Sequence, residues 1–192
     1  MLKRIGLYGG SFDPVHLGHL LVAQAAREEW GLDRIFFIPA AQSPFKPDRQ
    51  MAAAPTRLML LHLALVGRTD TEVDPQEIIR GGISYTIDTI RDYRSRFPQA
   101  ELFFLVGADH VPLLPKWRDS AELGKMVQFL VIPRPGEVAV TIPGGFQGCE
   151  LTGFPLGVSS SQIRSRIAAG LEIELLTGSA VAEAIKNNGL YL

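Results

Sequence analysis

The chain has 192 residues, of which 46% are hydrophobic and 20% are charged, as is typical of one compact globular domain. Nineteen Lys and Arg stand against twenty Asp and Glu, and the net charge of −1 excludes the strongly basic surface of a nucleic-acid coat protein. One cysteine excludes an internal disulfide and suits a reducing compartment, and no apolar run approaches the roughly eighteen residues of a membrane span. We therefore expect one cytoplasmic domain over residues 1–192, without a nucleic-acid or membrane partner.

Short apolar runs alternate with longer stretches of helical period. In chain order, the patterns predict a strand at residues 1–8, a helix at 17–30, a strand at 34–39, a helix at 55–66 and a weaker strand at 71–74. A helix at 85–97 and strands at 101–106 and 127–132 follow. The Gly- and Pro-rich segment 133–155 is expected to be irregular, with a short strand near Glu150, before final helices at 159–169 and 180–186.

This alternation predicts the fold class. Strands separated by helices of this length form βαβ units, and right-handed crossovers then place helices on both faces of a parallel sheet. The sequence therefore predicts an α/β fold with a doubly wound, Rossmann-like parallel sheet.

The most informative segment, residues 9–20, joins the first strand to the first helix. Gly9 and Gly10 allow a sharp turn that presents N–H groups to an anion, and the helix start adds its positive dipole end. His16 and His19 share one helix face and could donate hydrogen bonds to phosphate oxygens. Two bland alternatives are an ordinary turn and a zinc site, but zinc needs a third ligand, and the other histidines lie in unrelated patterns.

A second helix start, at Ser159, repeats this anion-friendly character. Ser159 and Gln162 fit a capping box, which explains the serine but not Arg164. Together, His16-Leu17-Gly18-His19 and the serine-rich start followed by Arg164 resemble the nucleotidyltransferase superfamily that carries the HxGH motif.

Four further segments resemble bacterial nicotinate-nucleotide adenylyltransferases in particular. They are the GISYTIDT run at 82–89, the GAD and LPKW elements within 107–117, the RPG at 134–136 and the NGLY ending at 188–191. Phosphopantetheine adenylyltransferases and glycerol-phosphate cytidylyltransferases are similar at the first turn, but they are shorter and lack the SYT and KW elements. This chain departs from the family pattern at Phe45, where the family has His, and at Arg118, where an aromatic residue is usual.

The resemblance implies adenylyl transfer from ATP to nicotinate mononucleotide, with Mg²⁺ arriving on ATP and no metal held by the protein. It implies that phosphates are held by His16, His19, Lys46 and Arg164, assisted by Gly9, Gly10, Ser11, Phe12, Ser159, Ser160 and Ser161. It implies nicotinate contacts from Ser84, Tyr85, Thr86, Trp117 and Arg118, and nucleotide contacts from Gly107, Asp109 and Arg134, with Asp109 on the adenylate ribose.

Structural roles remain open for several of these residues. Ser84 could be an ordinary helix N-cap, Tyr85 could pack on the core, and Arg118 could be a solvated loop charge. Trp117 follows Pro115 in what the sequence suggests is a polar loop, where an exposed indole suits stacking on a flat ring. Transfer to another phosphate acceptor such as nicotinamide mononucleotide, and a nucleotide sensor without turnover, are the alternative functions. The oligomeric state is also open, a homo-oligomer included.

Overall fold

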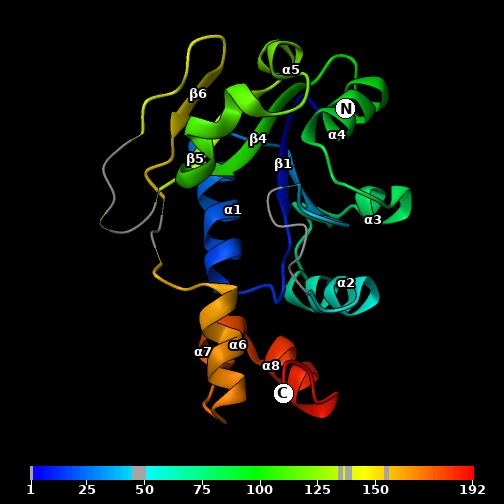
Figure 1. Cartoon of the computed structure of the whole chain (residues 1–192), viewed down its shortest axis with the longest axis vertical. Helices are drawn as coiled ribbons and strands as arrows, with labels where there is room; N and C mark the ends of the chain where they lie inside the picture. The colour runs from blue at the N-terminus through cyan, green and yellow to red at the C-terminus, as the bar shows by residue number, and fades with distance from the viewer. Residues whose placement is uncertain (1, 45–50, 134–135, 137–139, 154–155) are drawn as a thin grey trace.

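Six parallel strands form one sheet in the order β3-β2-β1-β4-β5-β6 (Figure 1). The computed structural model describes residues 2–44, 51–133, 136, 140–153 and 156–192. The strands are β1 (Arg4–Gly10), β2 (Arg34–Pro39), β3 (Thr71–Val73), β4 (Glu101–Gly107), β5 (Gln128–Ile132) and β6 (Gln147–Glu150). The predicted Rossmann-like α/β fold is confirmed, including the short strand near Glu150.

Helices cover both faces of the sheet, because successive side chains of each strand point to opposite sides. One core packs α1 (Leu17–Trp30), α2 (Ala54–Ala64), α6 (Ser160–Ala168), α7 (Glu174–Thr177) and α8 (Ser179–Asn187) against one face. The other core packs α4 (Thr86–Arg96), α5 (Ser120–Met126) and the 3₁₀ helix η1 (Ala108–Lys116) against the opposite face. Along β1, Leu7 belongs to the second core and Tyr8 to the first. No helix in the described ranges has the length and apolar character needed to cross a bilayer.

Four short helices were not predicted: α3 (Gln76–Arg80), η1, α5 and α7. The polar loop expected before Trp117 is wrong, because η1 occupies it. Val111 and Leu114 are fully buried and lie three residues apart, which matches the three-residue turn of a 3₁₀ helix. The burial of these two side chains therefore stabilises a helix here even though two prolines lie within it.

The strand order reverses between β1 and β4, and this positions the site. The chain runs outward from β1 to β2 and β3 on one side and from β4 to β5 and β6 on the other. Helical connections therefore leave in opposite directions at the β1–β4 boundary, which opens a crevice beyond the carboxyl ends of these strands. Gly9, Gly10 and Gly107 stand at those ends.

Candidate functional site

The turn after β1 brings two imidazole rings face to face. His16 is the N-cap of α1, and its ring centroid lies 3.7 Å from that of His19, at an interplanar angle of 32°. The His16 backbone N–H donates to Nδ1 of His19 over 3.1 Å, and the His19 N–H donates to the His16 carbonyl over 2.9 Å. This reciprocal pairing fixes the His19 ring at the helix start, and the His16 ring packs against it.

The packing of His16 leaves little room for a side chain at Gly18. A Cβ at position 18 would lie 3.0 Å from the His16 ring atoms Cε1 and Nδ1, and 3.0 Å from a methyl carbon of Val158. Such a distance is closer than carbon atoms normally approach. The glycine between the two histidines therefore lets the ring of His16 and the segment before α6 pack onto α1.

Burial keeps both imidazoles neutral near pH 7. Burial lowers the pKa of His16 to about 4, and burial followed by the neighbouring His16 lowers the pKa of His19 well below its usual range. Because Nδ1 of His19 accepts a hydrogen bond, its neutral ring carries the proton on Nε2. His16 is only 6% exposed, and its Nδ1 has no hydrogen-bond partner among the described residues.

The N-terminus of α6 is docked against the same turn. Ser160 Oγ donates to the Pro14 carbonyl over 2.9 Å, and Arg164 Nη1 donates to the Asp13 carbonyl over 2.7 Å. The capping box predicted for Ser159 and Gln162 is confirmed, with the Gln162 N–H donating to Ser159 Oγ over 3.2 Å. The two helix starts singled out in the sequence are thus neighbours in space.

These helix starts line one open cavity of about 820 Å³. Ten of the residues predicted as site residues line it: Gly9, Gly10, Ser11, His16, His19, Gly107, Asp109, Ser159, Ser160 and Ser161. Glycine backbone, neutral imidazoles, hydroxyls and helix N-termini are groups that bind phosphate without a full counter-charge. The cavity suits an anionic, phosphate-bearing ligand.

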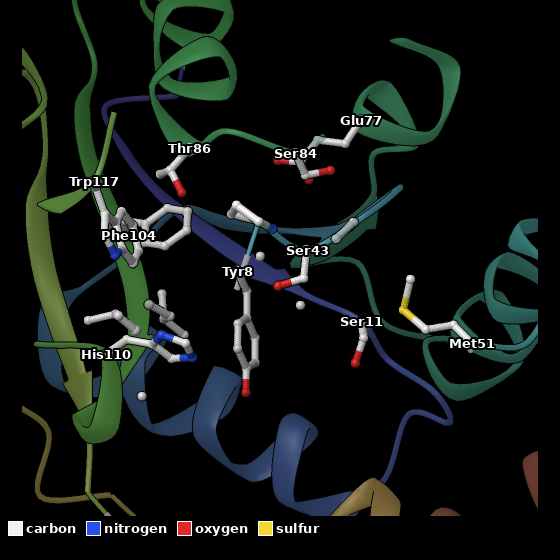
Figure 2. A pocket seen from close by; sticks show the side chains of 17 residues that line it. Tyr8, Ser11, Ser43, Met51, Glu77, Ser84, Thr86, Phe104, His110 and Trp117 are labelled. Carbon is white, nitrogen blue, oxygen red and sulfur yellow. The ribbon is translucent and has the colours of Figure 1, made fainter. Parts of the chain in front are cut away.

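A second cavity of about 240 Å³ adjoins the first (Figure 2). The two share the lining residues Tyr8, Gly9, Gly10, Ser11, Gly107 and His110. The walls that belong to the second cavity include Ser84, Thr86, Phe104 and Trp117. A pocket of about 90 Å³ lies between Tyr85, Thr86, Trp117 and Arg118 and shares Ser84, Thr86, Trp117 and Pro44 with it. Two ligands could therefore meet beside the glycines of β1.

Aromatic packing builds the far wall of the second cavity. The Trp117 ring meets Phe104 edge to face at 6.1 Å and Phe129 at 6.3 Å, and it packs on the core beside η1. The expectation of an exposed loop indole is therefore wrong, because Trp117 is anchored by these rings. The Arg118 guanidinium lies 4.8 Å from the centroid of the Tyr85 ring, a cation–π arrangement.

Ser84 is not the N-cap of α4. That position belongs to Tyr85, and the Ser84 hydroxyl accepts the Ala41 N–H over 2.9 Å instead. Tyr85 packs against the second core, which was one of the two roles considered for it. It also lines the smallest pocket.

Two predicted residues lie apart from the cavity walls, and two fall outside the described residues. The Phe12 side chain is buried among Tyr8, His19 and Phe37, and Phe12 lines neither cavity. Arg164 does not line the large cavity and bonds to Asp13 and Ser161. Lys46 and Arg134, together with Phe45, lie outside the described residues.

Sequence reasoning missed several residues that line the second cavity: Tyr8, Ala40, Ser43, Pro44, Met51, Glu77, Phe104 and His110. Tyr8 and Phe104 looked like core positions of strands, and Glu77 lay in a helix that was not predicted. The glutamate carried no signal either, because it stands among the polar residues Asp74, Gln76 and Arg80.

The described residues contain no group of three or more His, Cys, Asp and Glu side chains that could hold a metal ion. The donors of the large cavity, one exposed aspartate and three histidines beside hydroxyls, are not gathered into such a group, so they fit a metal that arrives bound to ligand phosphates better than a metal held by the protein.

Comparison with known proteins agrees with the geometry. The cytidylyltransferase-like family model matches residues 7–166. A protein of Opitutus terrae named "Probable nicotinate-nucleotide adenylyltransferase" is 40% identical over 192 residues, covering 98% of this chain and 97% of its own. A protein of Gemmatimonas aurantiaca with the same name is 44% identical over 195 residues, covering 98% and 92%.

Solved structures share the fold. Plasmodium falciparum nicotinic acid mononucleotide adenylyltransferase complexed with NaAD aligns with a TM-score of 0.77 at 17% identity, covering 98% of this chain and 97% of its own. The same enzyme complexed with APC aligns with a TM-score of 0.78 at 16% identity, with the same coverage.

Proposed function

This chain belongs to the nicotinate-nucleotide adenylyltransferases, of the cytidylyltransferase-like family, and we propose that its adjoining cavities hold the two nucleotides of that reaction side by side. The enzyme transfers the adenylyl group of ATP to nicotinate mononucleotide, forming deamido-NAD and diphosphate in NAD biosynthesis. An oxygen of the mononucleotide 5′-phosphate attacks the α-phosphorus, and the bond from that phosphorus to the diphosphate oxygen breaks. The nucleophile is already ionised near neutral pH, so no general base is needed.

The large cavity is the proposed ATP site. The observation that carries this assignment is that His16, His19 and the start of α6 line one cavity. Nε2–H of His19 donates to a phosphate oxygen, and the backbone N–H groups of Gly9 and Gly10 lie beside the same phosphates. Catalysis then consists of positioning and of stabilising the charge that builds up on the phosphates in the transition state.

Arg164, Lys46 and Arg134 complete the proposed phosphate site. Arg164 does not line the cavity but contacts Ser161, which does, and 28% of its side chain is exposed, so we propose that a change of rotamer turns its guanidinium from Asp13 toward the triphosphate. Lys46 and Arg134 are retained from the family pattern, and Asp109 is assigned to the adenylate ribose. Ser11 and the hydroxyls of Ser159, Ser160 and Ser161 assist at the phosphates.

The second cavity and the smallest pocket are the proposed nicotinate site. Trp117 offers its ring to the pyridine, and backbone N–H groups at the start of α4, near Tyr85 and Thr86, face the nicotinate carboxylate together with that of Arg118. The positive end of the α4 dipole favours this negative charge. Ser84 positions this helix start.

Mg²⁺ is the proposed metal, carried by the ATP phosphates and water. Its charge would neutralise the diphosphate that leaves. Asp109 is the carboxylate of the large cavity nearest to such a role, although it is assigned to the ribose. The single cysteine, Cys149, suits our proposal that the enzyme works in the reducing cytoplasm, and a homo-oligomer is compatible with the open rim of the cavities.

The test is to incubate the protein with ATP, Mg²⁺ and either nicotinate mononucleotide or nicotinamide mononucleotide, and to measure diphosphate and dinucleotide. We expect both products with nicotinate mononucleotide. Nucleotide binding without product would support a sensor instead, and product from the amide alone would reassign the acceptor.

A further inference from the structure

Glu77 is a buried carboxyl group in the wall of the second cavity, and the reaction described above gives it no task. It lies on α3, is 6% exposed and lines the cavity beside Ser84 (Figure 2). A buried charge without partners is costly, so a carboxyl group is kept in such a place only with compensating donors. The partners of Glu77 therefore indicate its purpose.

Two hydroxyls of the neighbouring segment hold this carboxyl group. Thr89 Oγ1, on the second turn of α4, donates to Glu77 Oε1 over 2.6 Å. The Ser84 side chain, just before α4, lines the same cavity wall and favours the charged form of this carboxyl group. Burial raises the pKa of Glu77, and the two hydroxyls partly offset that rise. Glu77 thus contacts the start of α4 through Ser84 and Thr89, which lie on either side of Thr86 in the sequence.

Ser84 also connects this part of the structure to the segment after β2. Its hydroxyl accepts the Ala41 N–H over 2.9 Å, and its own N–H donates to the Gln42 carbonyl over 2.9 Å. A hydroxyl has one proton, so a Ser84 hydroxyl that accepts from Ala41 keeps its proton for the carboxylate beside it. Thr89 and Ser84 thus connect the Glu77 carboxyl group to α4 and to the end of β2.

We propose that Glu77 is a positioning residue for the mononucleotide: through Ser84 and Thr89 it fixes the start of α4 and the segment after β2, which form two walls of the nicotinate site. This inference rests on the proposed function. Glu77 need not touch the substrate, because the groups that face nicotinate are Thr86 and the backbone of α4. The ATP site is built from α1 and α6, to which Glu77 makes no contact in the described hydrogen bonds.

The experiment measures KM for each substrate separately in Glu77→Ala and Glu77→Gln. Glu77→Ala should raise KM for nicotinate mononucleotide roughly tenfold, which is about the effect of losing one hydrogen bond. It should change KM for ATP less than twofold. Glu77→Gln keeps one acceptor oxygen for these hydroxyls and should recover part of the loss.

Asp74→Asn is the matched control. Asp74 is also a buried carboxylate next to α3, and it accepts from Tyr93 of α4 over 2.6 Å and from Arg96 over 2.7 Å. It lines neither cavity. Asp74→Asn should therefore lower the unfolding midpoint without changing the ratio of the two KM values.

The results separate the inference from the proposed function. Wild-type turnover of nicotinate mononucleotide tests the function alone, and the ratio of KM values in the variants tests Glu77. If Glu77→Ala does not fold, Glu77→Gln and calorimetric binding of the mononucleotide decide. An unchanged KM ratio in Glu77→Gln and Glu77→Ala, or an equal shift in Asp74→Asn, would reduce Glu77 to a purely structural role.

Discussion

In the proposed ATP site, His16 and His19 would meet the phosphates as neutral rings. Burial lowers the pKa of both, for His16 to about 4, so at pH 7 they act as hydrogen-bond donors and acceptors before ATP arrives. Such donors contribute most when negative charge builds up at the phosphates, because the protein has already oriented them. They can also take up a proton once a phosphate lies beside them, since a nearby negative charge favours the charged ring.

His19→Ala should therefore lower kcat by about 100-fold while raising KM for ATP much less. His62→Ala is the control, because His62 is an exposed histidine on α2 outside both cavities. Steady-state kinetics with ATP varied at saturating mononucleotide measures both constants. A folded His19→Ala protein with near wild-type kcat would remove His19 from the phosphate site.

The buried histidines also predict a pH dependence of stability. The pKa of His16 is about 4 when folded and about 6.5 when unfolded, so between these values the unfolded chain binds more protons. Stability should therefore be fully present above about pH 6.5 and fall as pH drops toward 4. His16→Asn, which keeps an N-cap side chain, should show a smaller loss of urea midpoint between pH 7 and pH 5. An equal loss in both proteins would mean that His16 titrates normally.

At the scale of elements, the helix starts are divided between the two cavities. The starts of α1 and α6 border the large cavity, and the start of α4 borders the second cavity, which is the proposed nicotinate site. The Arg118 guanidinium, over the Tyr85 ring and 3.8 Å from Asp88, adds a positive charge at the smallest pocket. If nicotinate binds there as proposed, a carboxylate should be favoured over an amide, which would have to turn its own donor toward at least one of these groups.

We expect a kcat/KM at least tenfold higher, as a rough estimate, for nicotinate mononucleotide than for nicotinamide mononucleotide, as one charge-assisted hydrogen bond implies. Arg118→Ala should narrow this ratio without abolishing it, because the backbone donors remain. Arg91→Ala, which removes another exposed arginine paired with α5, is the control. If Arg118→Ala leaves the ratio unchanged, the Arg118 side chain is a solvated loop charge that does not contribute to the choice of substrate.

The elements that the sequence predicted well carry their own local signals. The helix over residues 17–30 has the bounds of α1, because its apolar period is long and Gly31 adopts the left-handed conformation that ends it. The helices η1, α3, α5 and α7 were missed because they are short or rich in proline and form only where the core receives them. Their burial is a property of the folded molecule, which a local pattern does not contain.

At the scale of the whole molecule, hydrogen bonds at Asp13 join distant parts of the chain to the proposed phosphate site, and we call this group of contacts the Asp13 hub. Asp13 is 1% exposed, and its carboxylate accepts the Tyr191 hydroxyl over 2.9 Å and the Ala52 N–H over 3.2 Å. The buried Arg57 donates to the Ser11 carbonyl over 2.9 Å from the α2 side. The C-terminal segment, α2 and α6 thus hold the loop that carries His16.

Tyr191→Phe should destabilise the protein by about 1–3 kcal/mol, the cost of leaving a buried acceptor short of a donor. Leu192→Ala, at a side chain that is 90% exposed, should leave stability unchanged. Urea unfolding measures both. If Tyr191→Phe unfolds at the wild-type midpoint, the hydroxyl contributes nothing to the hub.

The site was only partly predictable, because some of its residues are marked by local sequence patterns and others are brought there only by the folding of the chain. The first turn and the start of α6 were recognisable because glycines, histidines and a capping box are local patterns. Tyr8 and Glu77 join the site only because the sheet order and the packing of α3 bring them to the crevice. Arg164 was assigned to the triphosphate, and its bond to the Asp13 carbonyl could not be predicted because it depends on how α6 docks.

The central claim is that both nucleotides lie together in the adjoining cavities, so that the adenylyl group passes directly from one to the other. The most direct measurement uses ATP with sulfur on a stereochemically defined α-phosphorus and determines the configuration of that phosphorus in the dinucleotide product. A single in-line displacement, which the shared wall of Gly9, Gly10 and Ser11 allows, predicts inversion. Retention of configuration would contradict the account, because it requires two displacements through an adenylylated side chain such as His16 or His19.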